Sequence, residues 1–377
     1  MTSALDVILE SGIQVAADGA EFADIGYRNY HATDATTNPS LVLSAISQPG
    51  YAYLLDDAVH CAAENMPDKD PKEQASLAMD YLLVQLGIEI LSMIPGRVSI
   101  SVDPRLAYDY DGILCKARNL IQAFEEHGIP RERILVKIPA TYPGIRAAQT
   151  LETPYLSSDA SSTANKPIHT NLTLVFGMVQ AMACAQAKVS VISPFVGRVK
   201  DWWNKTWEKT QSELPLSDHP GLRLVRKIQA HYDSHGYKTQ VMAAGFRRAE
   251  EVLELAKDGG RPSLVTLPPA ILRSLRSMRN IDSLSHPSAA ILEDDFPKRM
   301  YIAEPDSVTS DASEKNFIND LAREKIAMEK VPEGLEKFIE DTCILEVKLK
   351  VQLMLARVRS SPTMPGGWNV RYQEVKL

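Results

Sequence analysis

Lys137 lies in the centre of a short apolar run, residues 134–140, of the kind that forms a strand buried on both faces. An isolated ammonium there costs several kcal/mol unless it is paired or neutralised. Because burial lowers the pKa of a lysine, such a side chain can supply the neutral amine that forms an imine with a carbonyl compound. Lys137 therefore indicates Schiff-base chemistry. The competing interpretation is a lysine at a strand end whose ammonium reaches solvent.

The elements that must position this lysine alternate along the chain, with short β-branched runs separated by longer segments of helical period. We predict strands at 13–18, 31–37, 97–103, 134–140, 167–173, 189–195, 239–246 and 263–268. Helices are expected at 71–94, 110–127, 144–151, 174–186, 221–235, 248–257 and 269–278. Regular strand and helix units repeated in this way favour an α/β fold, a (β/α)8 TIM barrel with additional helices, over an open doubly wound sheet.

The end of the chain does not follow this repeat. We expect a surface loop at 153–166, a further helix at 315–341 and irregular structure at 360–377. Residues 344–359 alternate like a strand, although their Leu, Lys, Gln and Met content also permits a helix. We therefore divide the chain into a barrel domain, 1–342, and a C-terminal extension, 343–377.

The composition excludes several classes of function. The 377 residues carry a net charge of -7, which disfavours nucleic acid or an anionic membrane as a partner. The four cysteines show no C-x-x-C spacing, and no Gly-rich nucleotide-binding loop is present. We expect neither a metal nor an organic cofactor. Without a leader-like N-terminus or a long apolar segment, the expected location is the cytoplasm.

In a barrel, chemistry occurs at the C-terminal ends of the strands, and the polar residues at these ends form a coherent set. It comprises a carboxylate, an amine, small hydrogen-bonding groups and two guanidiniums, the groups that imine chemistry on a phosphorylated sugar requires. The members are Asp18, Asn38, Ser101, Lys137, Asn171, Thr173, Ser193, Arg198 and Arg247, and the apolar Phe195 lies among them at the end of its strand.

Each of these residues also has a purely structural interpretation. Asn38 before Pro39 is a typical helix N-cap, and an Asp after a strand commonly lies in a turn. Hydroxyls such as those of Thr173 and Ser193 often bond to neighbouring backbone, and an arginine often forms a surface ion pair. Two arginines at the ends of adjacent strands are better explained by a shared anion such as phosphate.

Five motifs in this order resemble the transaldolase family over about residues 10 to 340. They are Asp34-Ala-Thr-Thr-Asn-Pro-Ser40, the Lys137 segment with Gly144-Ile-Arg-Ala-Ala148, Asn171-Leu-Thr173, Ser193-Pro-Phe-Val-Gly-Arg198 and Phe246-Arg247. The resemblance implies that Lys137 forms the Schiff base and Asp18 acts as general base, with Thr173 and Ser101 near the catalytic water. It assigns Asn38, Asn171 and Ser193 to the sugar hydroxyls, and Arg198 and Arg247 to the phosphate.

The implied reaction transfers a dihydroxyacetone unit from sedoheptulose 7-phosphate or fructose 6-phosphate to glyceraldehyde 3-phosphate or erythrose 4-phosphate, in the pentose phosphate pathway. Phe195 favours transfer over cleavage, because the related fructose-6-phosphate aldolases carry a Tyr there. Three positions depart from the family pattern: Ser101 replaces a Glu, and Gly177 and Gly245 each replace a Ser. Two alternatives therefore stay open, an aldolase for another substrate and a sugar-phosphate-binding protein with impaired turnover. The oligomeric state is also open, with a homodimer among the candidates.

Overall fold

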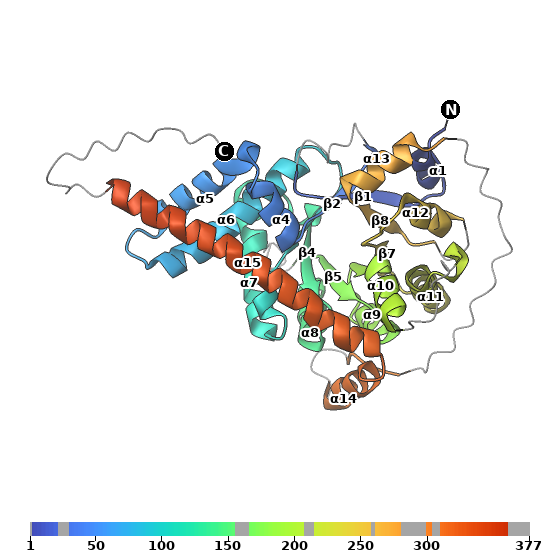
Figure 1. The fold of residues 1–377 in the computed structure, drawn as a ribbon. Helices are drawn as coiled ribbons and strands as arrows, with labels where there is room; N and C mark the ends of the chain where they lie inside the picture. The colour runs from blue at the N-terminus through green and yellow to red at the C-terminus, as the bar shows by residue number, and fades with distance from the viewer. Residues whose placement is uncertain are drawn as a thin grey trace.

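The computed structural model describes residues 2–21, 30–154, 166–206, 215–257, 261–279, 299–303 and 310–360. Its centre is a closed barrel of eight strands, β1 to β8 in chain order (Figure 1). Each strand is parallel to its neighbours, and β8 pairs with β1 to close the ring. The strands are β1 Gln14–Asp18, β2 Asp34–Thr36, β3 Val98–Ser101, β4 Ile134–Pro139, β5 Thr170–Val175, β6 Val191–Pro194, β7 Gln240–Ala243 and β8 Leu264–Leu267. The predicted (β/α)8 TIM barrel is confirmed.

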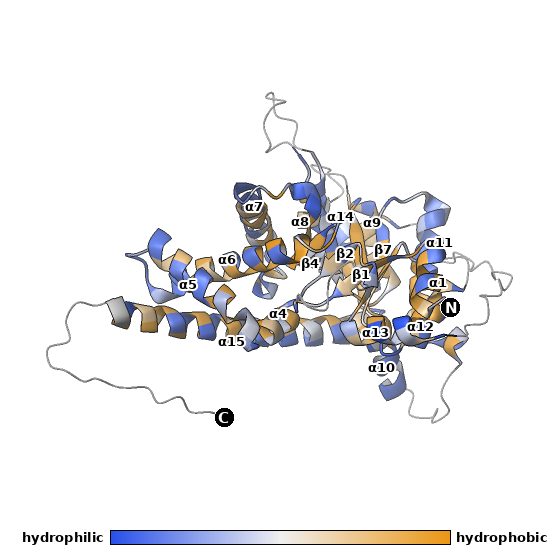
Figure 2. Ribbon diagram, turned by 90° about the horizontal axis from the view of Figure 1, so that it is seen from above, coloured by the Kyte–Doolittle hydropathy of each residue, from blue (hydrophilic) through white to orange (hydrophobic). Residues whose placement is uncertain are grey.

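Helices surround this barrel on its outside (Figures 1 and 2). Those before β5 are α1 Ala4–Glu10, α4 Pro39–Ile46, α5 Ala52–Asn65, α6 Pro71–Leu91, α7 Tyr110–Glu126 and α8 Tyr142–Glu152. Those after it are α9 Met178–Gln186, α10 Val196–Thr206, α11 Pro220–His235, α12 Ala249–Ala256, α13 Pro269–Ser277, α14 Ser310–Leu321 and α15 Lys325–Ser360. Short 3-10 turns lie at η1 Pro49–Tyr51, η2 Pro104–Leu106, η3 Arg131–Arg133 and η5 Leu216–Asp218.

The strands are buried because helices cover their outer faces and side chains fill the barrel. Every residue of β4 and β5 is buried, as expected for strands of a parallel sheet that is covered on both faces. Figure 2 shows apolar residues, in orange, gathered in the middle of the molecule around β4 and β7. Lys137 is thus held in the centre of a strand whose residues are all buried.

Local sequence signals determine where several helices begin. Asn38 caps α4 by accepting a hydrogen bond from the Leu41 amide, and Pro39 takes the first helical position. Thr141 caps α8 in the same way, with Pro143 in the first turn. A proline is favourable there because its missing N–H has no intrahelical partner in any case. Both capping residues lie two positions after the end of a strand, β2 or β4, so α4 and α8 begin at the mouth of the barrel.

The fifth strand departs from the sequence prediction. β5 continues to Val175, whereas we predicted a helix from residue 174. Leu174 has φ +60°, and the pairing of β5 with β6 shifts register between Leu172 and Val175. A non-glycine residue in this conformation is uncommon and carries strain, and such irregularities often re-aim side chains beside functional sites.

The end of the described chain is one long helix. α15 is continuous from Lys325 to Ser360, so residues 344–359 are helical, and a separate helix α14 precedes it. The boundary that we placed after residue 342 falls inside α15. This helix packs on α4, α5 and α6 and contacts η2, β5 and α10, extending along one side of the barrel (Figure 1). Residues 361–377, and most of the loop expected at 153–166, lie outside the described residues.

Candidate active site

Lys137 and Asp18 come together at the C-terminal mouth of the barrel. Lys137 on β4 is only 6% exposed, and its Nζ donates a hydrogen bond to the Thr37 carbonyl at 3.1 Å. Asp18 ends β1 and accepts a hydrogen bond from Thr36 Oγ1 at 2.7 Å. Thr36 Oγ1 also lies 2.6 Å from Thr266 Oγ1, so the Thr266 hydroxyl donates when Thr36 donates to Asp18. Strands β1, β2 and β8 therefore fix the carboxylate opposite the amine.

Burial opposes the charged form of both groups. It lowers the pKa of Lys137, an effect that the negative charge of Asp18 partly offsets. Burial likewise raises the pKa of Asp18, against the stabilising charge of Lys137 and the hydrogen bond from Thr36. The pair therefore favours a neutral amine and a more basic carboxylate than the free side chains would provide. A nucleophile and a proton acceptor require these properties.

Polar side chains on neighbouring strands form a hydrogen-bonded chain inside the barrel. Asn171 on β5 donates through Nδ2 to Ser99 Oγ at 3.2 Å and accepts from Ser193 Oγ at 2.8 Å. Asn171 is in register with Lys137, which is also in register with Ser101 on β3. Three strands thus present polar groups at one level, as residues from neighbouring strands do within a barrel.

Thr173 is the polar group of this site that lacks a partner. Its buried Oγ1 forms no hydrogen bond with any described atom. An unsatisfied buried hydroxyl costs about 1–3 kcal/mol, so a site that keeps one has a use for a water or ligand atom there. Thr173 is one of the two residues that the family resemblance assigns to the catalytic water.

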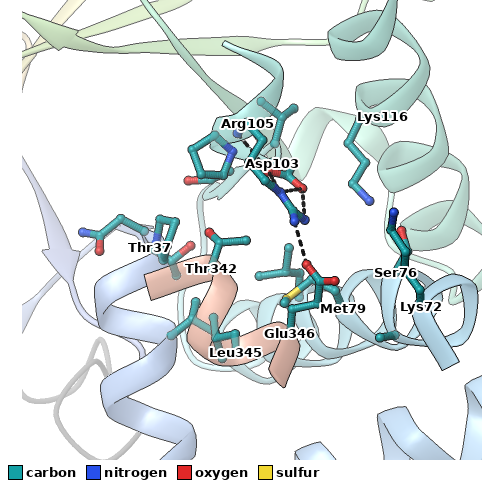
Figure 3. A pocket seen from close by; sticks show the side chains of 18 of the residues that line it. Thr37, Lys72, Ser76, Met79, Asp103, Arg105, Lys116, Thr342, Leu345 and Glu346 are labelled. Atoms are coloured by element: carbon teal, nitrogen blue, oxygen red, sulfur yellow. Dashed lines mark hydrogen bonds and ion pairs between the residues drawn. The ribbon is translucent and has the colours of Figure 1, made fainter. Parts of the chain in front are cut away.

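Ser101 and Asn38 open onto a cavity at the β2–β3 side of the mouth. Its volume is about 500 Å³, and α15 forms one wall through Thr342, Leu345 and Glu346 (Figure 3). Arg105 projects into it between Asp103 and Glu346, with bonds of 2.6 Å to both carboxylates. The short Ser101 side chain thus borders open space at the position where the family pattern has a glutamate.

The predicted phosphate-binding arginines lie at the β6–β7 rim. Arg198 on α10 has its guanidinium carbon 5.4 Å from the centre of the Phe176 ring, and its Nη2 donates to Glu333 at 2.9 Å. Arg247 follows β7, and its Nη2 donates to Asp201 at 2.6 Å. In this structure each guanidinium is therefore paired with a carboxylate of its own.

Phe195 links this rim to the barrel. Its backbone bridges to Ala244, and its ring centre lies 5.6 Å from that of Phe176. A side chain at Gly245 would come within 3.2 Å of the Phe195 ring, and Gly245 has φ +70°. This backbone conformation favours glycine, so the structure explains why the serine of the family pattern is absent here.

A second departure from the family pattern is compensated by another part of the chain. Gly177 is the N-cap residue of α9 and has no capping side chain. Glu324, from the turn before α15, takes over this role by accepting hydrogen bonds from the amides of Met178 at 2.8 Å and Val179 at 3.2 Å. A Cβ at Gly177 would lie 1.9 Å from Glu324 Oε2. Burial raises the pKa of Glu324 to about 7.

The structure brings together most of the predicted residues and adds some that the sequence did not single out. Asp18, Lys137, Asn171, Thr173 and Ser193 line the barrel mouth, whereas Arg198 and Arg247 lie at its rim. The sequence analysis missed Thr36 and Thr37, which support Asp18 and Lys137. Their position within the Asp34–Ser40 motif is the signal that could have found them. Within the described ranges, no group of His, Cys, Asp and Glu could hold a metal ion.

A closed parallel barrel with polar groups at the C-terminal ends of its strands is the architecture of the TIM-barrel enzymes. The family model described as Transaldolase/Fructose-6-phosphate aldolase matches residues 15–349. The chain belongs to this family, and it is a transferase of the transaldolase type.

Similar proteins agree with this membership. The chain is 38% identical to a probable transaldolase of Dictyostelium discoideum, over 93% of this chain and 99% of that protein. It is 38% identical to the transaldolase of Saccharomyces cerevisiae, over 91% and 93% of the two chains. It is 39% identical to the transaldolase of Actinobacillus succinogenes, over 94% and 100%.

Proposed function

We propose that this protein catalyses the transaldolase reaction of the pentose phosphate pathway. It transfers a dihydroxyacetone unit from sedoheptulose 7-phosphate or fructose 6-phosphate to glyceraldehyde 3-phosphate or erythrose 4-phosphate. The observation that supports this most strongly is the buried Lys137 amine opposite the Asp18 carboxylate, because burial lowers the pKa of Lys137 toward the neutral nucleophile and makes the Asp18 carboxylate a stronger base.

The proposed reaction begins when neutral Lys137 attacks the C2 carbonyl of the ketose phosphate and loss of water gives an imine. Asp18 takes the proton of the C4 hydroxyl, the C3–C4 bond breaks, and its electron pair moves into the protonated imine. The aldose phosphate leaves, and an enamine of dihydroxyacetone remains on Lys137. The enamine then attacks the carbonyl of the acceptor aldose, and hydrolysis of the new imine releases the product.

The remaining residues recognise the sugar. Asn38, Asn171 and Ser193 are proposed to bind its hydroxyls, and Thr173 and Ser101 to hold the water used in forming and hydrolysing the imine. The unpartnered hydroxyl of Thr173 supports the assignment of that residue. Arg198 and Arg247 bind the phosphate, and Phe195 lines the site without a hydroxyl that could activate water.

A trap for the imine tests this proposal. Borohydride reduction in the presence of fructose 6-phosphate should add the mass of a reduced dihydroxyacetone unit to the peptide that contains Lys137. The variant Lys257→Met, which removes an exposed lysine, is the matched control and should still be labelled. If the wild-type protein gave no adduct, the Schiff-base mechanism would be excluded. Omitting erythrose 4-phosphate from a turnover assay separates transfer, which stops, from aldol cleavage, which continues.

The same proposal includes a homodimer in the cytoplasm. All four cysteines are free thiols, as is usual in a reducing compartment. No helix among the described residues is long and apolar enough to cross a membrane. Ile344, Val347, Val351 and Val358 are exposed on α15 at spacings of three, four and seven residues, a pattern that supports self-association. Light scattering of wild-type protein and of a Val351→Lys variant tests it, because a monomer in both would exclude the dimer.

A further inference from the structure

Glu333, near the start of α15, joins two cations. Its Oε1 accepts a hydrogen bond from Arg198 Nη2 at 2.9 Å, and its Oε2 accepts one from Lys330 Nζ at 2.7 Å. Lys330 precedes Glu333 by three residues, so both side chains lie on the same side of the helix. The Glu333 carboxylate is therefore bound to the guanidinium of Arg198, which the proposed function assigns to the substrate phosphate.

The guanidinium of Arg198 lies between the Phe176 ring and the backbone of α15. On one side is the Phe176 ring, whose centre lies 5.4 Å from the guanidinium carbon. On the other is Gly334, where a Cβ would come within 2.8 Å of Arg198 Nη1 and 2.7 Å of Leu174 Cδ2. Any larger residue at this position would displace the guanidinium or the strained end of β5. The first turns of α15 are thus fitted to Arg198.

The three charged side chains differ in how freely they can move. Glu333 is 55% exposed, whereas Arg198 is 20% and Lys330 12% exposed. An exposed ion pair contributes only about 0–1 kcal/mol, so the carboxylate can swing into solvent at little cost. The two cations would remain in place. Phosphate oxygens engage arginine with nearly the same geometry as carboxylate oxygens, so one phosphate can bridge the same two cations.

We propose that Lys330 is an additional ligand of the substrate phosphate and that Glu333 is the resident anion which this phosphate displaces. The inference rests on the proposed function, because it takes Arg198 as part of the phosphate site. In the absence of substrate, Glu333 neutralises part of the positive charge at the rim. A phosphate dianion, with more charge than a carboxylate, displaces Glu333 and then contacts both Arg198 and Lys330.

The proposal predicts opposite effects from two residues only three positions apart. Lys330→Met removes a cation from the phosphate and should raise KM for fructose 6-phosphate about tenfold. Glu333→Gln keeps a hydrogen-bond acceptor for Arg198 but removes the competing charge, so it should lower this KM about threefold. Neither variant should change kcat more than about twofold, because both act on binding that is equal in ground state and transition state.

The experiment measures two quantities for the wild type and both variants. One is KM for fructose 6-phosphate at saturating erythrose 4-phosphate, and the other is Kd for inorganic phosphate by titration calorimetry. Lys337→Met is the matched control, because Lys337 forms a similar pair with Asp341 further along α15. Thermal melting confirms that each variant is folded. Inorganic phosphate binding does not depend on turnover, so it separates a failure of this inference from a failure of the proposed function.

The expected result is a weaker phosphate Kd in Lys330→Met, a tighter one in Glu333→Gln, and no change in Lys337→Met. A phosphate Kd unchanged in Lys330→Met would overturn the role of Lys330. A weaker Kd in Glu333→Gln would overturn the displacement of Glu333 and show instead that its charge positions Arg198. Absence of turnover in a wild type that binds phosphate in the expected pattern would refute the transaldolase activity alone.

Discussion

The interior of the barrel mouth and its β6–β7 rim hold their charges in different ways. Lys137 and Asp18 lie inside, with pKa values shifted by burial, and strands on several sides hold them in place. Arg198 and Arg247 lie at the rim, where each pairs with a carboxylate that is about half exposed, Glu333 or Asp201. Proton transfer and amine attack need a dry, rigid setting, whereas capture of an anion needs charges that can exchange partners.

The interior and the rim also differ in how their charged residues affect the stability of the folded state. Burial of Lys137 and Asp18 disfavours their charged forms, so these residues reduce the stability of the folded state in return for reactivity. The rim pairs cost little because water still reaches them. Substitutions in the interior should therefore remove chemistry and spare or raise stability, whereas substitutions at the rim should change affinity.

The largest effect is expected from Lys137→Met. Without the amine no imine forms, and turnover should fall by at least about 10⁴-fold. The melting temperature should stay equal or rise, because a buried amine whose charged form is disfavoured is replaced by an apolar side chain of similar length, and the raised pKa of Asp18 lets that carboxyl take up a proton. Steady-state kinetics and calorimetry measure both. A substantial residual rate would mean that Lys137 is not the nucleophile.

Asp18→Asn should lower kcat by about 10² to 10⁴-fold, because the amide cannot accept the C4 proton. In the wild type, activity should fall as pH drops through the pKa values of Lys137 and Asp18. Because Asp18 raises the pKa of Lys137, the variant should move the acid limb of borohydride labelling to lower pH.

Asp80→Asn provides the matched control for Asp18→Asn. Its carboxyl pKa is also raised by burial, but it lies on α6 beside Lys116 and away from Lys137. This variant should leave kcat unchanged. An equal loss of rate in both variants would contradict a specific role for Asp18.

At the rim, Arg247→Met should raise KM for fructose 6-phosphate about tenfold with little change in kcat, because a charge-assisted bond to the phosphate is lost. Asp201→Asn, which frees Arg247 from its partner, should change KM slightly in the opposite direction. A donor without phosphate, such as dihydroxyacetone, should respond to neither variant. A fall in kcat with KM unchanged would show that Arg247 acts in the chemical step, as Lys137 and Asp18 do, and not in phosphate binding.

Ser101→Glu restores the carboxylate of the family pattern beside the cavity at the β2–β3 side. If the missing carboxylate limits the handling of water at Thr173, kcat should rise about tenfold. Ser101→Gln has a similar size without the charge and is the control. An unchanged kcat in Ser101→Glu would show that Ser101 serves the reaction as well as the glutamate.

The last prediction concerns stability rather than activity, at the helix α9 next to the rim. Folding raises the pKa of Glu324 from 4.5 to about 7, so its stabilising contribution is complete below pH 4.5 and is lost as pH rises to 7. The loss amounts to at most about 3 kcal/mol. Glu324→Gln retains an acceptor for the α9 amides, so its melting temperature should depend less on pH in this range. A parallel pH dependence in the two proteins would exclude Glu324 as the cause.

The sequence by itself determined the barrel and the main polar residues of its mouth. A lysine in a fully apolar strand has few explanations, and β-branched runs alternating with helical segments leave few folds. Polar residues such as Asp18 and Asn38 were found because their position at a strand end is a local property, visible in the order of residues.

Only the tertiary structure decided how those residues are supported and what the end of the chain does. Leu345, Leu349 and Leu353 are buried and Val347 and Val351 are exposed, but their alternation in the sequence fitted a strand as well as a helix. Which side of α15 is covered depends on α4, α5 and α6, which are far away in sequence. The pairs Thr36–Asp18 and Glu333–Arg198 likewise join distant segments, so no local pattern specifies them.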